Sequence, residues 1–188
     1  MGRWEPNARG RLEQAALELF SEHGFEQTTA ADIAERAGLT ERTFFRYFAD
    51  KREVLFGGAG SLQDLLASTL AGTPESVAPI DAVATALQAA ARVLQERRDY
   101  ARQRQTLIAA NPELQERELI KLASLSAALA DTLRRRGVNE PAASLTAEAG
   151  IAVFRIAFDR WVKGPDERDF PQLIEESLDE LKAVTAGR

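Results

Sequence analysis

The chain has 188 residues, 45% hydrophobic and 28% charged, which is enough for one ordinary domain or for a small module joined to a larger one. Because the sequence contains no cysteine, disulfides and thiolate chemistry are excluded. A formal net charge of -5, taken alone, argues against nucleic acid as a partner. The sequence has no apolar run of roughly 18 to 20 residues and no secretory signal, so we expect a cytoplasmic protein without membrane contact.

Helical periodicity runs through the whole chain, and no segment alternates apolar and polar residues as a half-buried strand does. An all-α fold of about nine helices is therefore predicted. In chain order the expected helices span residues 7–22, 29–38, 40–48, 50–70, 81–96, 99–110, 113–136, 141–163 and 170–186. Residues that can cap these helices at their N-terminal ends are Thr29, Thr40 and Asp50. Residues 71–79 contain one glycine and two prolines, which favours a loop.

Residues 28–56 carry the pattern that is most informative about function. Two short helices joined by a turn at Gly38 are typical of a helix-turn-helix, in which the second helix enters the major groove of DNA. The 3.6-residue spacing is expected to bury Leu39, Phe44 and Phe48 and to expose the opposite face. The candidate base-reading residues on that face are Glu41, Arg42, Phe45 and Arg46.

Hydroxyls, helix N-terminal amides and cations placed around the groove suit DNA phosphates. The candidate phosphate-binding residues are Thr29, Thr40, Thr43, Tyr47 and Lys51. The basic residues expected at the N-terminal arm and the reading edge are Arg3, Arg9, Arg11, Arg42, Arg46, Lys51 and Arg52. Acidic residues of the first two helices are expected to face away from DNA, and they are Glu13, Glu18, Glu22 and Glu35. With this placement the acidic net charge does not exclude DNA.

The N-terminal segment resembles the DNA-binding signature of the TetR family of bacterial transcriptional regulators, in the run Thr29-x-x-x-Ile33-Ala34-x-x-Ala37-Gly38-Leu39-Thr40-x-x-Thr43-Phe44-Phe45-x-Tyr47-Phe48-x-x-Lys51-x-x-x-Leu55. The resemblance implies a three-helix DNA-binding domain over residues 1–50 and a larger domain over residues 51–188 that binds a small ligand and dimerises. It also implies that four of the residues above touch phosphates, namely Thr29, Thr43, Tyr47 and Lys51. Two positions depart from the family pattern: Ala31 is short for a base contact, and Arg46 stands where His or an aromatic residue is common.

The C-terminal part has no comparable motif, and its clues are polar or aromatic residues within apolar helices. The candidate ligand-binding residues are Arg102, Gln105, Arg155, Phe158, Asp159 and Trp161. The alternative roles are ion pairing or surface exposure for the arginines, and a place in the core or a dimer interface for Trp161. Residues 97–100 and 155–161 are similar to regulators of the mycofactocin type, which implies an acyl-CoA-like ligand.

The resemblances imply a ligand-responsive repressor that binds a palindromic double-stranded DNA operator as a homodimer and is released by a small hydrophobic or acyl-type effector. An enzyme is not expected, because the chain has one histidine, no cysteine and no glycine-rich phosphate loop, and we expect neither cofactor nor metal. His23 is interpreted as a helix-terminal capping residue. The alternative function is a helical ligand-binding or interaction module that does not bind DNA.

Overall fold

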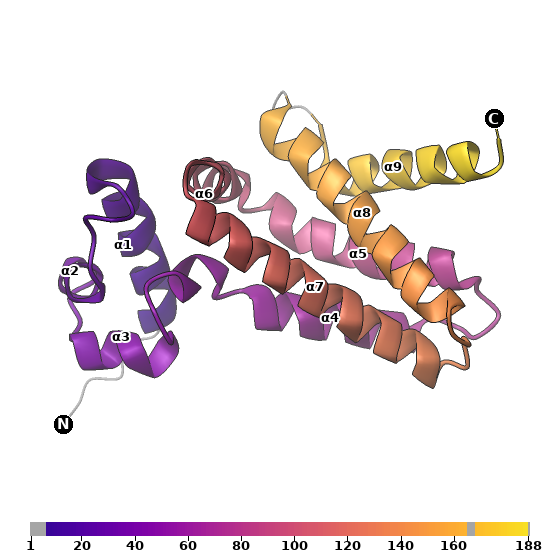
Figure 1. The fold of residues 1–188 in the computed structure, drawn as a ribbon, viewed down its shortest axis with the longest axis horizontal. Helices are drawn as coiled ribbons and strands as arrows, with labels where there is room; N and C mark the ends of the chain where they lie inside the picture. The colour runs from indigo at the N-terminus through magenta and orange to yellow at the C-terminus, as the bar shows by residue number, and fades with distance from the viewer. Residues whose placement is uncertain (1–6, 165–167, 188) are drawn as a thin grey trace. The chain divides into compact units, whose positions relative to one another are not determined.

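The computed structural model describes residues 7–164 and 168–187, and in these ranges it contains nine α-helices, one 3-10 helix and no strand (Figure 1). In chain order they are α1 (Ala8–His23), α2 (Ala30–Arg36), α3 (Glu41–Tyr47), the 3-10 helix η1 (Glu53–Phe56), α4 (Ala59–Gly72), α5 (Pro79–Gln95), α6 (Arg98–Ala110), α7 (Pro112–Arg135), α8 (Ala142–Lys163) and α9 (Phe170–Thr185). The predicted all-α fold is confirmed. No helix in the described ranges is both long enough and apolar enough to span a bilayer.

The chain forms two compact units. The first comprises residues 1–58 and 103–118, and the second comprises residues 59–102 and 119–188. Two helices, α6 and α7, each contribute residues to both units, because the boundaries at 102/103 and 118/119 fall inside them. Residues 103–118, where α6 ends and α7 begins, form the α6–α7 corner. This corner belongs to the first unit, together with α1, α2, α3 and η1.

Aromatic side chains form much of the core of the first unit. Phe20 on α1 and Phe44 on α3 are both about 1% exposed or less, and Phe20 meets the ring of Phe25 edge to face at 5.1 Å. The short helices α2 and α3 have only seven residues each, too few for independent stability in water. Their stability therefore comes from this packing and from their caps.

The prediction of a single helix over residues 50–70 is wrong. A 3-10 helix ends at Phe56, and α4 begins at Ala59 after two glycines that are poor helix formers. Gly57 also lies so close to α1 that a Cβ there would collide with the Glu13 carboxylate, and its carbonyl accepts a hydrogen bond from Arg9. The close approach to α1 favours glycine at this position, and the glycine pair interrupts the helix.

The second unit is organised around α5, which packs against α4, α8 and α9, while α8 also packs along α9 (Figure 1). The alanines of α5 that are fully buried at these contacts are Ala82, Ala86, Ala90 and Ala91. Small side chains permit close packing of the helices, and at Gly150 of α8 an added Cβ would lie 2.5 Å from Cγ1 of Val83.

The loop predicted over residues 71–79 is shorter than expected, because α4 continues to Gly72 and α5 starts at Pro79. The guanidinium of Arg136 donates to the carbonyls of Leu70, at 3.1 Å, and Pro74, at 2.9 Å. These contacts satisfy carbonyl groups at and after the end of α4 and so stabilise its last turn.

Candidate nucleic-acid interface

Helix α3 begins at a side-chain cap. Thr40 has extended backbone angles, φ -98° and ψ 154°, and its Oγ1 accepts a hydrogen bond from the Thr43 amide at 3.2 Å. The two threonine hydroxyls lie 3.0 Å apart at the exposed N-terminal edge of the helix. This edge combines hydroxyl donors with the partial positive charge of a helix N-terminus, a combination that suits an anion.

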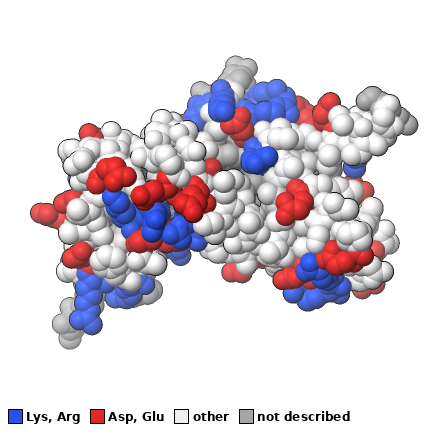
Figure 2. Space-filling model, viewed as in Figure 1, with Lys and Arg blue, Asp and Glu red and all other residues white. Residues whose placement is uncertain are grey.

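The face of α3 that the sequence predicts to be exposed is exposed. The residues on it are Glu41, Arg42, Phe45 and Arg46. On the opposite face Phe44 and Phe48 are buried, as expected, whereas Leu39 is only half-buried, because it lies in the turn before the helix rather than on it. Figure 2 shows basic side chains gathered at the lower left, where Figure 1 places α3.

Two side chains of α3 are held in place by aromatic contacts. The Phe45 ring is 52% exposed and meets the ring of Phe44 edge to face at 5.4 Å. The Arg46 guanidinium lies 5.0 Å from the centre of the Tyr47 ring, and its Nη2 donates to the phenol oxygen at 3.3 Å. The exposed Phe45 ring is therefore available for contact with another surface.

Helix α2 starts with the capping box that the sequence predicts. The Asp32 amide donates to Oγ1 of Thr29 at 3.1 Å, and the Asp32 carboxylate accepts from the Thr29 amide at 2.8 Å and from its hydroxyl at 2.7 Å. The hydrogen bonds from the Thr29 side chain and backbone lower the pKa of Asp32 below its usual value. The Thr29 side chain is exposed, so its hydroxyl lies at the protein surface beside the first turn of α2.

Several cations expected at the reading edge are bound within the protein. Lys51 donates to the backbone carbonyl of Phe25 at 2.8 Å, Arg9 lies over the Phe48 ring and donates to the Gly57 carbonyl, and Arg52 pairs with Asp50 at 3.0 Å. Arg11 is half-buried, and Arg3 lies outside the described residues. The basic residues of this set whose side chains are exposed on α3 are Arg42 and Arg46.

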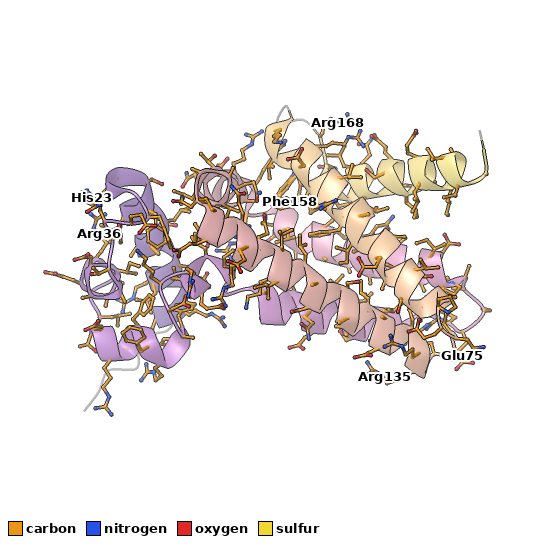
Figure 3. All side chains as sticks on the ribbon, viewed as in Figure 1. His23, Arg36, Glu75, Arg135, Phe158 and Arg168 are labelled. Carbon is orange, nitrogen blue, oxygen red and sulfur yellow. The ribbon has the colours of Figure 1, made fainter. Side chains whose placement is uncertain are left out.

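Two of the four acidic residues that are expected to face away from DNA, Glu18 and Glu22, form ion pairs with α2. Arg36 of α2 pairs with Glu22 at 2.8 Å and with Glu18 at 3.4 Å. His23 and Arg36 lie at the upper end of this unit in Figure 3, whereas α3 lies at its lower end. The hydrogen bond from Arg36 lowers the pKa of Glu22. A polar hollow of about 440 Å³ opens beside this network.

Two arginines of the α6–α7 corner bind the segment that follows α3, residues 50–55. The sequence analysis did not identify these arginines. Arg117 of α7 donates to Glu53 at 2.8 Å and to Asp50 at 3.3 Å, and Arg104 of α6 donates to the Leu55 carbonyl at 2.7 Å. Burial raises the pKa of Asp50, but hydrogen bonds from Arg52 and the Glu53 amide and the charges of Arg52 and Arg117 outweigh burial and lower it. No local sequence pattern indicates these partners, which are about 50 to 67 positions apart.

The candidate ligand residues do not form one cluster. Gln105 belongs to the first unit and donates to Glu118 at 3.3 Å. Arg155 is exposed, and Asp159 pairs with Lys163 at 2.6 Å on the surface of α8. Arg102 donates to the Val162 carbonyl at 2.9 Å and the Gly164 carbonyl at 2.6 Å. It therefore caps the C-terminal end of α8 within the second unit.

Phe158 and Trp161 lie together in an aromatic cluster of the second unit, where Figure 3 labels Phe158. Trp161 is fully buried and stacks on Phe170 at 4.8 Å with an interplanar angle of 11°. Its indole N–H has no hydrogen-bond acceptor among the described residues, which is uncommon for a buried donor. Phe154 and Phe170 complete the cluster, and helical spacing from Phe158 could have indicated Phe154. No group of three or more potential metal ligands occurs in the described ranges.

A helix-turn-helix with an exposed second helix, in a chain that also forms a larger helical unit, defines a DNA-binding regulatory protein. The family model described as bacterial regulatory proteins, tetR family, matches residues 13–56, and the model described as MftR C-terminal domain matches residues 77–186. The chain belongs to the TetR family of transcriptional regulators and has an MftR-type C-terminal domain.

Three similar proteins agree with this assignment. The HTH-type transcriptional regulator TcmR of Streptomyces glaucescens is 37% identical over 81 residues, which cover 43% of this chain and 36% of TcmR, so this chain matches about a third of that relative's length. The mycofactocin biosynthesis transcriptional regulator MftR of Mycobacterium tuberculosis is 29% identical over 136 residues, which cover 72% of this chain and 69% of MftR. The transcriptional regulator FadR from Bacillus subtilis, solved in complex with stearoyl-CoA, shares the fold with a TM-score of 0.64 at 19% identity, covering 92% of this chain and 96% of FadR.

Proposed function

We propose that this protein is a repressor that binds a palindromic operator as a homodimer and is released when a small hydrophobic or acyl-type ligand binds its second unit. The observation that carries the DNA-binding part is the geometry of α3. Its buried phenylalanines anchor one face, and its other face exposes the residues Glu41, Arg42, Phe45 and Arg46. The protein would act by binding and would have no catalytic step of its own.

Each of these four side chains has a chemically suitable partner on a base edge. An arginine such as Arg42 or Arg46 can donate two hydrogen bonds to O6 and N7 of guanine. The Phe45 ring can contact the methyl group of thymine, and Glu41 can accept from the amino group of cytosine. We assign these four residues to base reading.

The phosphate contacts in this proposal come from hydroxyl groups beside α3 and at the start of α2. Thr29, Thr40 and Thr43 lie at helix N-terminal turns, where hydroxyls and backbone amides favour an anion. Tyr47 adds a phenol that is 38% exposed. Neutral donors of this kind position a protein on DNA and contribute little to the salt dependence of binding.

The dimer interface is supported by an apolar stripe on α8. Leu145 and Ile156 are 67% and 53% exposed, and Ala149 and Ala152 lie between them at helical spacing. Val184 of α9 is 64% exposed. A second copy of the chain would cover this stripe by two-fold symmetry and present two α3 helices to half-sites about 34 Å apart.

The ligand would bind beside the aromatic cluster of the second unit. The buried indole N–H of Trp161 can donate to a carbonyl or carboxylate of a ligand, while Phe158 and Phe154 offer apolar surface to a chain. The MftR-type domain and the stearoyl-CoA complex of FadR, which shares the fold, favour an acyl ligand. A ligand that prefers the conformation with poor DNA affinity by a few kcal/mol would shift the population and release the operator.

The test of the DNA-binding proposal is a titration of the purified protein against the intergenic DNA beside its own gene and against a random-sequence library. We expect a protected palindrome with half-sites one helical turn apart and a sedimentation mass of twice the chain's 20.6 kDa. If neither DNA shows a sequence preference, the regulator proposal fails and a helical module without DNA binding replaces it.

The ligand proposal is tested separately with stearoyl-CoA as the probe. The chain has two tryptophans, so the Trp4→Phe variant reports the fluorescence of Trp161 alone. We expect stearoyl-CoA, and not coenzyme A, to change this fluorescence and to lower operator affinity at the same concentrations. Release of DNA without any change at Trp161 would contradict this location of the ligand.

A further inference from the structure

Arg46 is held against its neighbour Tyr47 on the exposed face of α3. Its guanidinium carbon lies 5.0 Å from the centre of the Tyr47 ring, within the range of a cation–π contact. Its Nη2 also donates a hydrogen bond to the phenol oxygen at 3.3 Å. A contact with the face of a ring and a hydrogen bond to the hydroxyl of the same ring together restrict the conformations of this long side chain.

The Tyr47 ring is itself supported by the core of the first unit. Its centre lies 6.4 Å from the centre of the Phe48 ring, and the Phe48 ring lies 5.4 Å from that of Phe44. Phe44 and Phe48 are both buried, whereas Tyr47 is 38% exposed, so the tyrosine connects the buried face of α3 with its surface. The guanidinium of Arg46 therefore rests on a ring that is anchored by core packing.

Arg42, the other exposed arginine of α3, lacks such a support. It lies one helical turn before Arg46, and its guanidinium has no hydrogen bond, ion pair or aromatic contact among residues 7–164 and 168–187. A long side chain that is mobile in the free protein loses conformational entropy when it binds, which lowers affinity by about 2- to 10-fold. In Arg46 part of this entropy is already lost in the free protein.

The hydrogen-bonding capacity of the pair remains sufficient for DNA. The phenol oxygen of Tyr47 accepts from Arg46 and keeps its own hydrogen, which can be donated to a phosphate oxygen. A guanidinium has five N–H donors, so Arg46 can use one on the phenol and two others on O6 and N7 of guanine. One tyrosine can therefore contact the DNA backbone and hold a base-reading side chain at the same time.

We propose that Tyr47 is a positioning residue for Arg46 and that the pair determines the preference for guanine at one position of each half-site. This inference rests on the proposed function, because it assigns a role in specificity within the base-reading face of α3. A tyrosine that contacted only phosphate would change the affinity for all DNA sequences alike. A tyrosine that positions Arg46 changes the discrimination between base pairs as well.

The experiment measures how Tyr47→Phe changes discrimination at the base pair that Arg46 reads. That base pair is located first, as the G·C pair whose replacement by A·T in both half-sites no longer weakens the binding of Arg46→Ala. Discrimination is the ratio of the affinity for the operator to the affinity for the replaced operator, measured by fluorescence anisotropy. Tyr47→Phe keeps the aromatic ring and removes only the hydroxyl.

We expect Tyr47→Phe to lower this ratio by about 2- to 10-fold per half-site and to leave discrimination at the other base pairs unchanged, including any that Arg42 reads. A lost phosphate contact weakens both DNAs equally and cancels in the ratio. In Arg46→Ala the added Tyr47→Phe should leave the ratio unchanged, because the side chain that it positions is absent. The matched control is Tyr100→Phe, which removes the hydroxyl of the chain's other tyrosine, also in contact with an arginine, Arg97, at 4.5 Å, and should leave every ratio unchanged.

The second readout needs no DNA. Rotation about the Nε–Cζ bond of an arginine, measured by ¹⁵N NMR, is slowed when its guanidinium is held by other groups. In the wild type we expect slower rotation in Arg46 than in Arg42, and in Tyr47→Phe we expect this difference to shrink. All variants are measured at a temperature at which they are fully folded, and if Tyr47→Phe does not fold, the comparison of the two arginines in the wild type decides.

An unchanged ratio at the Arg46 base pair in Tyr47→Phe overturns the proposal, and so does an equal fall at every base pair. Equal rotation of Arg46 and Arg42 in the wild type overturns it too. Failure of the proposed function has a different signature: the wild type would show no operator preference, or Arg46→Ala would weaken all DNA alike. The NMR comparison would still test the contact between Arg46 and Tyr47 in that case.

Discussion

The cap of α3 allows a test in which two variants of Thr40 rank in one order by stability and in the reverse order by DNA affinity. Oγ1 of Thr40 accepts from the Thr43 amide at 3.2 Å, and the hydroxyl lies at the edge that we assign to phosphate contact. Thr40→Ala removes the acceptor. Thr40→Asp keeps an acceptor at the same position and adds a negative charge there. Thr40→Ser keeps both the acceptor and the neutral hydroxyl and serves as the control.

The stability effects follow from capping. Loss of a threonine cap costs about 1 kcal/mol, so Thr40→Ala is expected to lower the free energy of unfolding by about that amount. Aspartate is as good a cap as threonine or better, and its charge interacts favourably with the helix dipole. Thr40→Asp is therefore expected to unfold within a few tenths of a kcal/mol of the wild type.

The effects on DNA affinity are expected in the reverse order. A carboxylate about 6 Å from a phosphate is repelled by about 0.7 kcal/mol at the dielectric constant of water and by about 2.8 kcal/mol at an effective value of 20. These energies correspond to about a 3-fold to a 100-fold loss of affinity per half-site. Thr40→Ala, measured where it is folded, loses only one neutral contact and is expected to bind more tightly than Thr40→Asp.

Urea unfolding measures the stability order of the variants. Fluorescence anisotropy with labelled operator measures their order of DNA affinity. The expected stability order is Thr40→Asp close to the wild type and Thr40→Ala below both. The expected affinity order is wild type and Thr40→Ser, then Thr40→Ala, then Thr40→Asp. Wild-type operator affinity in Thr40→Asp would refute the placement of this helix edge against phosphates.

Three further predictions concern base reading, acid stability and packing. Arg46→Ala is expected to weaken operator binding by about 10-fold or more per half-site and random DNA much less, in competition gel shifts, and equal losses would contradict base reading. Because the pKa of Asp50 is lowered in the folded protein, its contribution to stability is present above its usual pKa of 3.8 and is lost as the pH falls through the folded value. Arg117→Met should raise the pKa of Asp50 in an NMR titration and flatten the acid limb of the stability curve, and an unchanged pKa would exclude this coupling. Gly150→Ala should destabilise the protein, since about 1 to 3 kcal/mol of overpacking against Val83 exceeds about 1 kcal/mol of helix propensity, and adding Val83→Ala should restore stability in thermal unfolding.

The parts of the molecule that could be predicted from sequence depend on neighbours three or four positions apart. The capping box of Thr29 and Asp32, the cap at Thr40 and the exposed face of α3 are all of this kind, and the structure agrees with each of them. A cap is formed within one helical turn, and the exposed face of a short helix follows from its period. The sequence resemblance to TetR regulators also rests on this contiguous segment.

The partners of long cationic side chains could not be predicted in this way. Lys51 meets carbonyls about 23 to 26 positions earlier in the chain, and Arg102 meets carbonyls about 60 positions later. No local pattern around Lys51 or Arg102 indicates these carbonyls, and the phosphate contact expected of the first and the ligand contact expected of the second stay predictions. A flexible side chain can reach any acceptor within several ångströms, and which acceptors lie there depends on how distant helices pack.

The sequence by itself determined where most of the helices lie, the caps at Thr29 and Thr40 and the face that α3 exposes, because these depend on local hydrogen bonding and helical period. Only the tertiary structure decided which cations remain exposed beside that face and where the helix predicted over residues 50–70 is interrupted. It also assigned the α6–α7 corner to the first unit. The physical reason is that burial, close approach at Gly57 and ion pairing at Asp50 arise between residues that are far apart in the chain and meet only after folding.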